Sequence, residues 1–261
     1  MSGEARVSDP LPSRKRVWWE IAIVLGLSLG QSAVYSVIDI VAALTAPTPI
    51  GEQTTALNPS QSPREWLDFT YQFAGVVFAF APVALALWLL WQPAVSGFRR
   101  IGLDWRGRRA GRDIGGGFAL LAIIGIPGIA LYAVGRMLGF TIDVQAAPLA
   151  GYWWTIPMLV LSALRSAAEE EVIVIGYLFT RLRELGWRGW WIIAAAALLR
   201  GSYHLYQGFG SFVGNAVMGV VFGWVYRRWG RVLPLVVAHL LLDVISFVGY
   251  PLAVQLWPGV F

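Results

Sequence analysis

Long apolar runs alternate with short polar segments along most of the chain. A run of about 20 apolar residues can cross about 30 Å of hydrocarbon as an α-helix. Such runs predict seven membrane-spanning helices, at approximately 18–44, 66–91, 114–135, 155–180, 189–207, 208–226 and 232–250. The apolar tail 251–261 is short and contains two prolines, so it predicts a half-helix or an interfacial cap. The pattern therefore indicates an all-α, polytopic membrane helical bundle of seven or eight transmembrane helices.

The polar segments between these runs indicate how the helices are connected. The runs 189–207 and 208–226 are almost continuous, so we expect a tight helical hairpin that turns near 205–211. The one long polar loop covers 45–65. The polar segment 1–17 lacks a small-residue cleavage site after it, so it is interpreted as a cytosolic tail rather than a signal peptide. The rest of the chain is expected to form one membrane domain.

Composition supports the membrane assignment. Hydrophobic residues make up 57% of the chain and charged residues 13%, whereas soluble domains carry about 25% charged residues. The 14 tryptophans suit a protein anchored at membrane–water interfaces, because the indole ring is apolar and its N–H is polar. Cysteine is absent, which excludes disulfides, thiolate catalysis and Cys-ligated metals.

The basic residues are distributed unevenly about the predicted spans. Sixteen of the 20 Lys and Arg residues fall on the same predicted side as the N-terminus. Basic loops remain in the cytosol, so the pattern predicts a multi-pass protein of the plasma membrane with a cytosolic N-terminus. The net charge of +5 is then a topology signal and indicates no nucleic-acid partner. The use of 19 Arg against one Lys suggests a bacterial source with a high GC content.

Ionisable residues inside the predicted spans are few and concentrated. Glu169, Glu170 and Glu171 follow one another between apolar segments. An unpaired charge at the bilayer centre costs about 2.5–3.5 kcal/mol, so these carboxyl groups must be paired, protonated or in contact with water. Arg165 lies four residues before Glu169 and can pair with it on one helix face. Glu170 and Glu171 then require another explanation.

Both histidines of the chain also fall inside predicted spans. His204 and His239 lie on separate helices, and Asp243 follows His239 by four residues on the same face. Three helices thus offer proton-active groups to the bundle interior. Any one of these groups taken alone has a structural interpretation, such as an interhelical hydrogen bond or a buried His–Asp pair.

Together these groups can carry out hydrolysis. A carboxylate in an apolar pocket has its pKa raised toward neutrality and can take a proton from water. A histidine can orient that water or stabilise the oxyanion that forms when the water attacks a carbonyl. Glu170, His204 and His239 would also satisfy a catalytic zinc with an open position, although the H-E-x-x-H signature is absent. The same acidic groups also suit a proton-coupled transporter.

The order and spacing of these residues resemble the CPBP family of intramembrane proteases, which comprises CAAX proteases and bacteriocin-processing enzymes and is also called the Abi family. Its three motifs are E-E-x-x-x-R, often followed by Gly, then F-x-x-x-H, and then H-x-x-x-N or H-x-x-x-D. The corresponding segments here are "EEVIVIG" at 170–176, "RGSYH" at 200–204 and "HLLLD" at 239–243. The resemblance covers about 150–250, and the three N-terminal spans match in hydropathy only.

The resemblance implies a role for each motif residue. Glu170 would be the general base for water, Glu171 its neighbour in the first motif, and His204 and His239 would complete the water or oxyanion site. Asp243 would stand where the family has Asn or Asp. Residues 151–261 would form the protease core, and 18–150 would contribute the first three spans.

The resemblance also bears on cofactor and substrate. The family is labelled metalloprotease, and a metal-free glutamate mechanism is also argued for it, so the cofactor is either a divalent metal such as zinc or none. The substrate would be a peptide or a lipid-anchored protein at the bilayer. The alternatives are a non-catalytic pseudoprotease that acts as a scaffold or self-immunity protein, and a proton-coupled transporter.

Two positions depart from the family pattern. Ile175 stands where the family has Arg, and Arg200 stands where it has Phe. Our hypothesis is that Arg200, on a neighbouring helix, replaces the missing arginine and neutralises Glu171. For His204 to reach the depth of Glu170, either 187–191 lies along the interface or the fifth helix breaks near Arg200 and Gly201.

Overall fold

The computed structural model describes residues 13–105, 107–147, 149 and 151–256, and it is mostly helical. The predicted tail at 1–17 therefore lies mainly outside the described residues. Helix α1 begins at Arg14, earlier than predicted, because the Ser13 Oγ accepts a hydrogen bond from the Arg16 backbone N–H at 3.3 Å and caps the helix.

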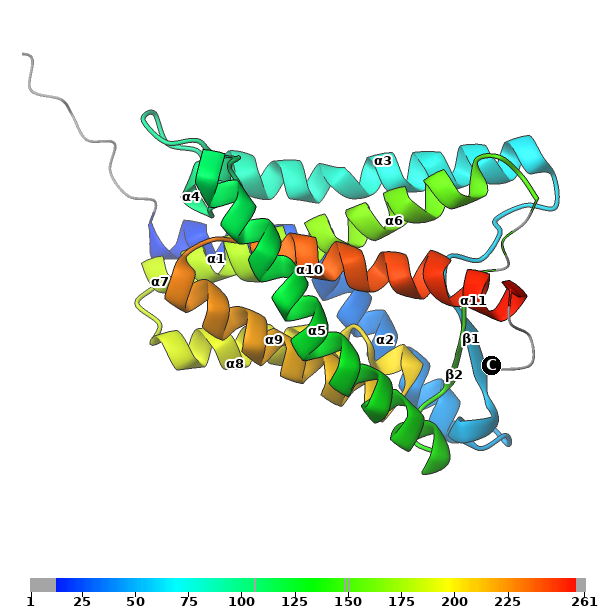
Figure 1. The fold of residues 1–261 in the computed structure, drawn as a ribbon. Helices are drawn as coiled ribbons and strands as arrows, with labels where there is room; N and C mark the ends of the chain where they lie inside the picture. Colours follow the sequence, from blue (N-terminus) through cyan, green and yellow to red (C-terminus); the bar gives the residue numbers. More distant parts are fainter. Residues whose placement is uncertain (1–12, 106, 148, 150, 257–261) are drawn as a thin grey trace, which may run out of the picture.

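Long helices lie side by side and form a single bundle (Figure 1). In chain order the helices are α1 (Arg14–Gly26), α2 (Leu29–Thr45), α3 (Glu65–Leu89), α4 (Gly97–Arg100), α5 (Gly107–Met137), α6 (Thr155–Glu170), α7 (Leu178–Glu184), α8 (Gly189–Ser202), α9 (Phe209–Trp229), α10 (Leu233–Val244) and α11 (Tyr250–Leu256). Two π-helical segments, η2 (Glu171–Tyr177) and η4 (Ile245–Gly249), join α6 to α7 and α10 to α11. Short 3-10 helices are η1 (Ile50–Glu52) and η3 (Leu205–Gln207).

Among the described residues, four helices are long and apolar enough to cross a membrane. They are Glu65–Leu89, Gly107–Met137, Phe209–Trp229 and Leu233–Leu256. Helices α1 and α2 can supply a fifth span, but they are bent by 55° at the break between them. The protein is thus a multi-pass membrane protein, and the predicted count of seven or eight spans is not confirmed.

The two remaining predicted spans fall short for physical reasons. The predicted span 155–180 is helical, but Arg165 and the three consecutive glutamates make it too polar. The predicted span 189–207 contains only the 14-residue helix α8, which is about 21 Å long. The hairpin predicted for this region is present, since α8 and α9 pack against each other and η3 connects them. Both segments are therefore helical, but the first is too polar and the second too short to count as a membrane span.

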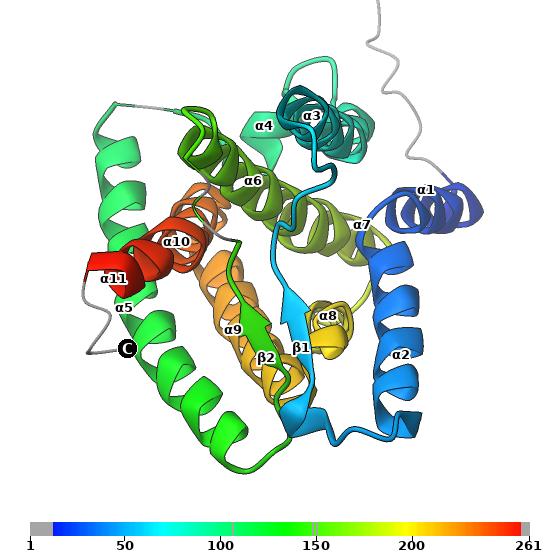
Figure 2. The same cartoon turned by 90° about the vertical axis from the view of Figure 1, so that its right-hand side faces the viewer.

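The continuous rod α6–η2–α7 lies inside the bundle, where it packs against α3, α8 and α10. In the end-on view of Figure 2, α2 and α5 lie on opposite edges with α8 and α9 between them. All seven residues of η2 are buried, and most belong to the main hydrophobic core. The motif glutamates therefore lie at the start of the best-buried segment of the chain.

The basic segments gather at one end of the bundle, on the left in Figure 1. Arg181 pairs with Glu20 at 2.7 Å, and Arg231 pairs with Asp113 at 2.6 Å. Arg100 pairs with Glu184. These ion pairs join α7 to α1 and α4, and join α5 to the connection before α10. The charge pattern predicts that this end faces the cytosol.

A small parallel ribbon covers the opposite end (Figure 2). Strand β1 (Thr54–Ala56) pairs with β2 (Asp143–Gln145), with Thr54 opposite Asp143. The ribbon contacts the α8–α9 connection through a bridge between Thr141 and Gly208. Gly208 has φ +93°, and a Cβ there would lie 2.8 Å from the Phe140 carbonyl oxygen, so only glycine fits.

Candidate active site

The first motif lies where α6 changes to the π-helical segment η2. Glu170 is the last residue of α6 and Glu171 the first of η2. The wider turn is packed against the segment before α5, because a Cβ on Gly176 would meet the Ile101 side chain at 2.8 Å. Single π-helical turns of this kind occur frequently at functional sites. Glu170 keeps 7% of its surface exposed and Glu171 none.

Arg200 links both motif glutamates. Its Nη1 donates to Glu171 Oε1 at 2.7 Å, and its Nη2 lies 3.1 Å from Glu170 Oε2. The guanidinium is fully buried and lies over the Phe222 ring at 5.3 Å. The contact that the arginine-exchange hypothesis requires is therefore present, while Ile175 is fully buried in the apolar core.

His239 completes this buried cluster from α10. Its Nδ1 lies 2.9 Å from Glu171 Oε1 and 3.1 Å from Arg200 Nη2. One ring nitrogen cannot form hydrogen bonds with both partners. It would have to accept from the guanidinium, which only donates, and donate to the carboxylate, which only accepts. Arg200 Nη2 already has Glu170 as an acceptor, so we assign Nδ1–H as the donor to Glu171. The other ring nitrogen, Nε2, then faces Asp243 Oδ2 at 3.6 Å.

Tyr203 is a site residue that the sequence analysis missed. Its hydroxyl donates to Glu170 Oε2 at 2.8 Å, and the residue is 5% exposed. The hydrogen bonds and ion pairs described for Glu170 engage Oε2, so Oε1 is the oxygen free to meet a water molecule. The only available sequence signal was the position of Tyr203 directly before His204.

His204 lies next to this cluster rather than within it. It interacts electrostatically with Glu170, Arg200 and His239, and its ring packs edge-on against Tyr203 at 4.8 Å. Within the described part of the chain, its Nδ1 is buried and has no hydrogen-bond partner. Helix α8 ends at Ser202, in agreement with the expected break near Arg200 and Gly201, and this break brings His204 to the level of Glu170.

Glu169 is set apart from its two neighbours. It lies 3.5 Å from Arg165 through Oε2, the pairing expected one helical turn apart. The arrangement separates a peripheral pair from the buried cluster formed by Glu170, Glu171, Arg200 and His239.

Ligand-type atoms of Glu170, Glu171 and His239 lie within 4.8 Å of one another. This group differs from the predicted metal set, because it contains Glu171 and not His204. The Arg200 guanidinium contacts all three residues, so a fixed positive charge already lies among the atoms that would hold a divalent cation. The residues present therefore fit a metal poorly, and the cluster suits a glutamate mechanism without one.

An open groove reaches Tyr203, the residue that contacts Glu170. We call it the α2 groove; it has a volume of about 480 Å³ and is lined by Gln31, Ser32, Tyr35, Ser36, Asp39, Tyr203 and Tyr206. The α2 residues follow one another on a single helix face. Ser36 Oγ accepts a hydrogen bond from the Tyr206 backbone N–H at 2.7 Å. Since Tyr203 also contacts Glu170, the groove ends at the side chain that holds the motif glutamate.

The fold and site together define a multi-pass helical membrane protein with a buried cluster of glutamate, histidine and arginine in its interior. Residues 152–245, which contain all three motifs, match the model of the family described as Type II CAAX prenyl endopeptidase Rce1-like. This match confirms the resemblance and supports assignment of the chain to the CPBP/CAAX protease family. Neither the curated proteins nor the solved structures give a significant match.

Proposed function

We propose that this protein is an intramembrane endopeptidase that hydrolyses a peptide bond with water activated by Glu170. The family match supports a peptidase and does not favour the transporter or scaffold alternatives. The single observation that carries the proposal is the asymmetric environment of the two motif glutamates. Glu171 is fully buried against Arg200 and His239, whereas Glu170 keeps 7% of its surface exposed and contacts Tyr203, which lines the α2 groove.

The asymmetry assigns the two carboxylates different roles. Arg200 neutralises Glu171, which in turn fixes His239, so these three groups act as positioning residues. Tyr203 and Arg200 both contact Glu170 Oε2, so they fix the carboxylate and leave its other oxygen to accept the proton. A base held in one rotamer by its neighbours needs little reorganisation before it accepts a proton.

The reaction proceeds in two steps. Glu170 Oε1 takes a proton from water, and the hydroxide oxygen forms a bond to the carbonyl carbon of the substrate. The negative charge moves to the carbonyl oxygen, which His204 stabilises by donating a hydrogen bond. Glu170 then gives its proton to the leaving nitrogen as the C–N bond breaks, and the products are a carboxylic acid and an amine. General-base catalysis of this kind contributes about 10²–10⁴-fold.

His239 and Asp243 support the base from α10. The His239–Asp243 contact at 3.6 Å is too long for a strong hydrogen bond, so it acts through charge and orientation. Their role in the proposal is to keep Nδ1–H directed at Glu171 and thereby hold Arg200 in place.

The α2 groove suits the approach of both water and peptide. Its polar face on α2 contrasts with the apolar residues on the rest of that helix, such as Val34, Val37 and Ile38, which are more than 45% exposed. A substrate segment anchored in the bilayer could reach Glu170 from the side, without crossing the basic end of the bundle. We propose a membrane-associated peptide or a lipid-anchored protein as substrate, at the plasma membrane.

Cleavage of lipidated and unlipidated peptides by the purified protein in detergent tests the proposal. Wild type should cleave, Glu170→Gln and His239→Ala should lose the activity, and a chelator should leave wild type active. Activity that follows an imposed proton gradient without peptide-bond cleavage would instead support a transporter. Inhibition by the chelator, reversed by added zinc, would show that the activity depends on a metal and contradict the metal-free mechanism.

A further inference from the structure

A second cavity lies far from Glu170, at the end of the bundle opposite to the basic segments. It has a volume of about 180 Å³ and lies between the loop 58–63, the first turns of α3 and the start of α6. Thr155 in its wall begins α6, and Glu170 ends it, so the two sites are about 22 Å apart along the helix. The space is sufficient for several waters or a small organic group.

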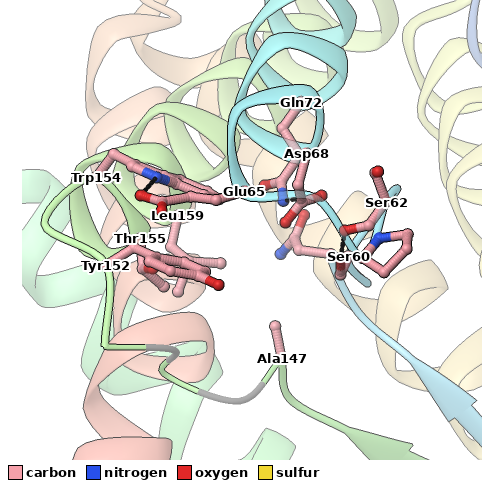
Figure 3. A pocket seen from close by; sticks show the side chains of 12 residues that line it. Ser60, Ser62, Glu65, Asp68, Gln72, Ala147, Tyr152, Trp154, Thr155 and Leu159 are labelled. Atoms are coloured by element: carbon pink, nitrogen blue, oxygen red, sulfur yellow. Dashed lines mark hydrogen bonds between the residues drawn. The ribbon is translucent and has the colours of Figure 1, made fainter.

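Two carboxylates in this cavity have only neutral partners. Glu65 Oε1 accepts from Trp154 Nε1 at 3.3 Å, as Figure 3 shows. Asp68 Oδ1 accepts from the Gln61 backbone N–H at 2.6 Å and from Gln72 Nε2 at 3.0 Å. In the ranges that the structure describes, neither carboxylate forms an ion pair with Lys or Arg. Acidic residues in a first helical turn are stabilised by the helix dipole, so this pair does not by itself indicate a ligand.

Thr155 supplies a second, independent observation. The residue is 8% exposed and lines the cavity, and within the described ranges its Oγ1 is buried with no hydrogen-bond partner. Buried hydroxyl groups are almost always hydrogen-bonded, because an unpaired one is costly. A donor bound in the cavity would satisfy this oxygen.

Aromatic rings form one side of the cavity, opposite Asp68 and the serines of the loop (Figure 3). Tyr152 and Trp154 stack with ring centroids 5.5 Å apart and planes inclined by 10°. Trp154 is 3% exposed and packs edge-on against Phe69. Aromatic faces attract cations through the ring quadrupole, and an apolar wall suits the carbon atoms of an organic ligand.

We infer that this cavity binds the primary ammonium group of an organic amine. Such a group donates three hydrogen bonds, and Glu65, Asp68 and Thr155 offer acidic or hydroxyl oxygens around one space. Among the described residues, the one group of three metal-ligating side chains lies elsewhere, and two carboxylates beside aromatic rings suit an organic cation better than a metal. The ammonium can come from a phosphatidylethanolamine headgroup or from a free small amine.

The test uses the full-length protein and follows thermal unfolding. Ethanolamine should raise the melting temperature of wild type, and ethylene glycol, its neutral analogue of similar size, should not. Glu65→Gln and Thr155→Val should weaken ethanolamine binding about tenfold or more. Thr155→Val should fold normally, since it replaces an unpaired buried hydroxyl with a methyl group. Glu52→Gln, an exposed carboxylate on the same side of the bundle, is the matched control and should bind like wild type.

Nanodiscs separate the two sources of the ammonium group. Stabilisation by phosphatidylethanolamine in phosphatidylglycerol nanodiscs, lost in Glu65→Gln, would identify the lipid headgroup, whereas a response to soluble ethanolamine alone would identify a free amine. Either result supports the site. Equal stabilisation by ethylene glycol, wild-type binding by both variants, or no response to either amine source would overturn it.

Discussion

The hydroxyl group of Tyr203 is the smallest feature with a testable role. Its hydrogen bond to Glu170 Oε2 fixes the proposed base, and hydrogen bonds to charged groups contribute about 1.5–3 kcal/mol. Tyr203→Phe should therefore lower kcat roughly tenfold to hundredfold and leave KM unchanged, because the ring still lines the α2 groove. Steady-state kinetics of Tyr206→Phe, another groove tyrosine, provide the control, and an equal loss in both variants would argue against a role in positioning the base.

Arg200 carries the second prediction at the residue scale. Removing one partner of a buried ion pair costs about 3–5 kcal/mol, so Arg200→Phe should sharply lower the melting temperature and abolish activity. Ile175→Arg combined with Arg200→Phe restores the family pattern and should recover both properties. The new arginine lies about one turn from Glu171 and can reach its carboxylate.

A matched control for Arg200 is Arg165→Ala, which removes a partly exposed pair with Glu169. Exposed pairs contribute about 0–1 kcal/mol, so this variant should remain close to wild type in melting temperature. Identical behaviour of Arg200→Phe and the double variant would contradict the arginine-exchange hypothesis.

Sequence reasoning at the residue scale succeeded where the contact follows from spacing. His239 and Asp243 could be paired because four residues separate them on one helix. The contact between Arg200 and Glu171 could be anticipated because one departure from the family pattern removes an arginine, at Ile175, and the other introduces one, at Arg200. Tyr203 could not be found in this way, since its direction depends on where α8 ends.

At the scale of elements, the polar face of α2 should be in contact with water. The chain contains no cysteine, so single cysteines can be labelled without background. Ser32→Cys, in the α2 groove, should react with a charged, membrane-impermeant thiol reagent. Val37→Cys, 46% exposed on the same helix but outside the groove, should react slowly because a thiolate does not form in lipid. Equal reaction rates at the two positions would rule out a water-filled groove.

Hydropathy predicted where the helices lie better than it predicted how many of them span the membrane. The apolar run 18–44 gave no sign of the 55° bend between α1 and α2. Helix α8 is short because the chain turns at η3, and this turn sets the position of His204. A hydropathy window cannot detect such a turn. Strands β1 and β2 have three residues each, too few for an alternating pattern to be recognised.

At the scale of the whole molecule, the arrangement of basic residues predicts the orientation in the membrane. Thr48 and Ala94 are exposed. Thr48 lies in the connection after α2 and Ala94 in the connection after α3, and these two helices end at opposite ends of the bundle (Figure 1). In intact cells, Thr48→Cys should be labelled by an impermeant reagent, and Ala94→Cys should be labelled only after permeabilisation. The reverse pattern would place the basic end outside and contradict the predicted cytosolic N-terminus.

Both cavities also belong to this scale, and neither could be predicted from the sequence. The α2 groove joins residues 31–39 to Tyr203 and Tyr206, and the second cavity joins the loop 58–63 to the start of α6. Each cavity forms between segments that are far apart in the sequence, and the hydropathy of one helix does not show which distant segment packs against it. The family match likewise covers only 152–245, so it contains no information on α2 or α3.

The most direct test of the account compares Glu170→Gln with Glu169→Gln in one peptide-cleavage assay on equally folded protein. The two changes are chemically identical and adjacent in sequence, but only Glu170 meets Tyr203 and Arg200 next to the groove. Glu170→Gln should lower kcat/KM by about 10²–10⁴-fold, and Glu169→Gln should remain within a few-fold of wild type. Full activity of Glu170→Gln would contradict the assignment of Glu170 as the base that activates water.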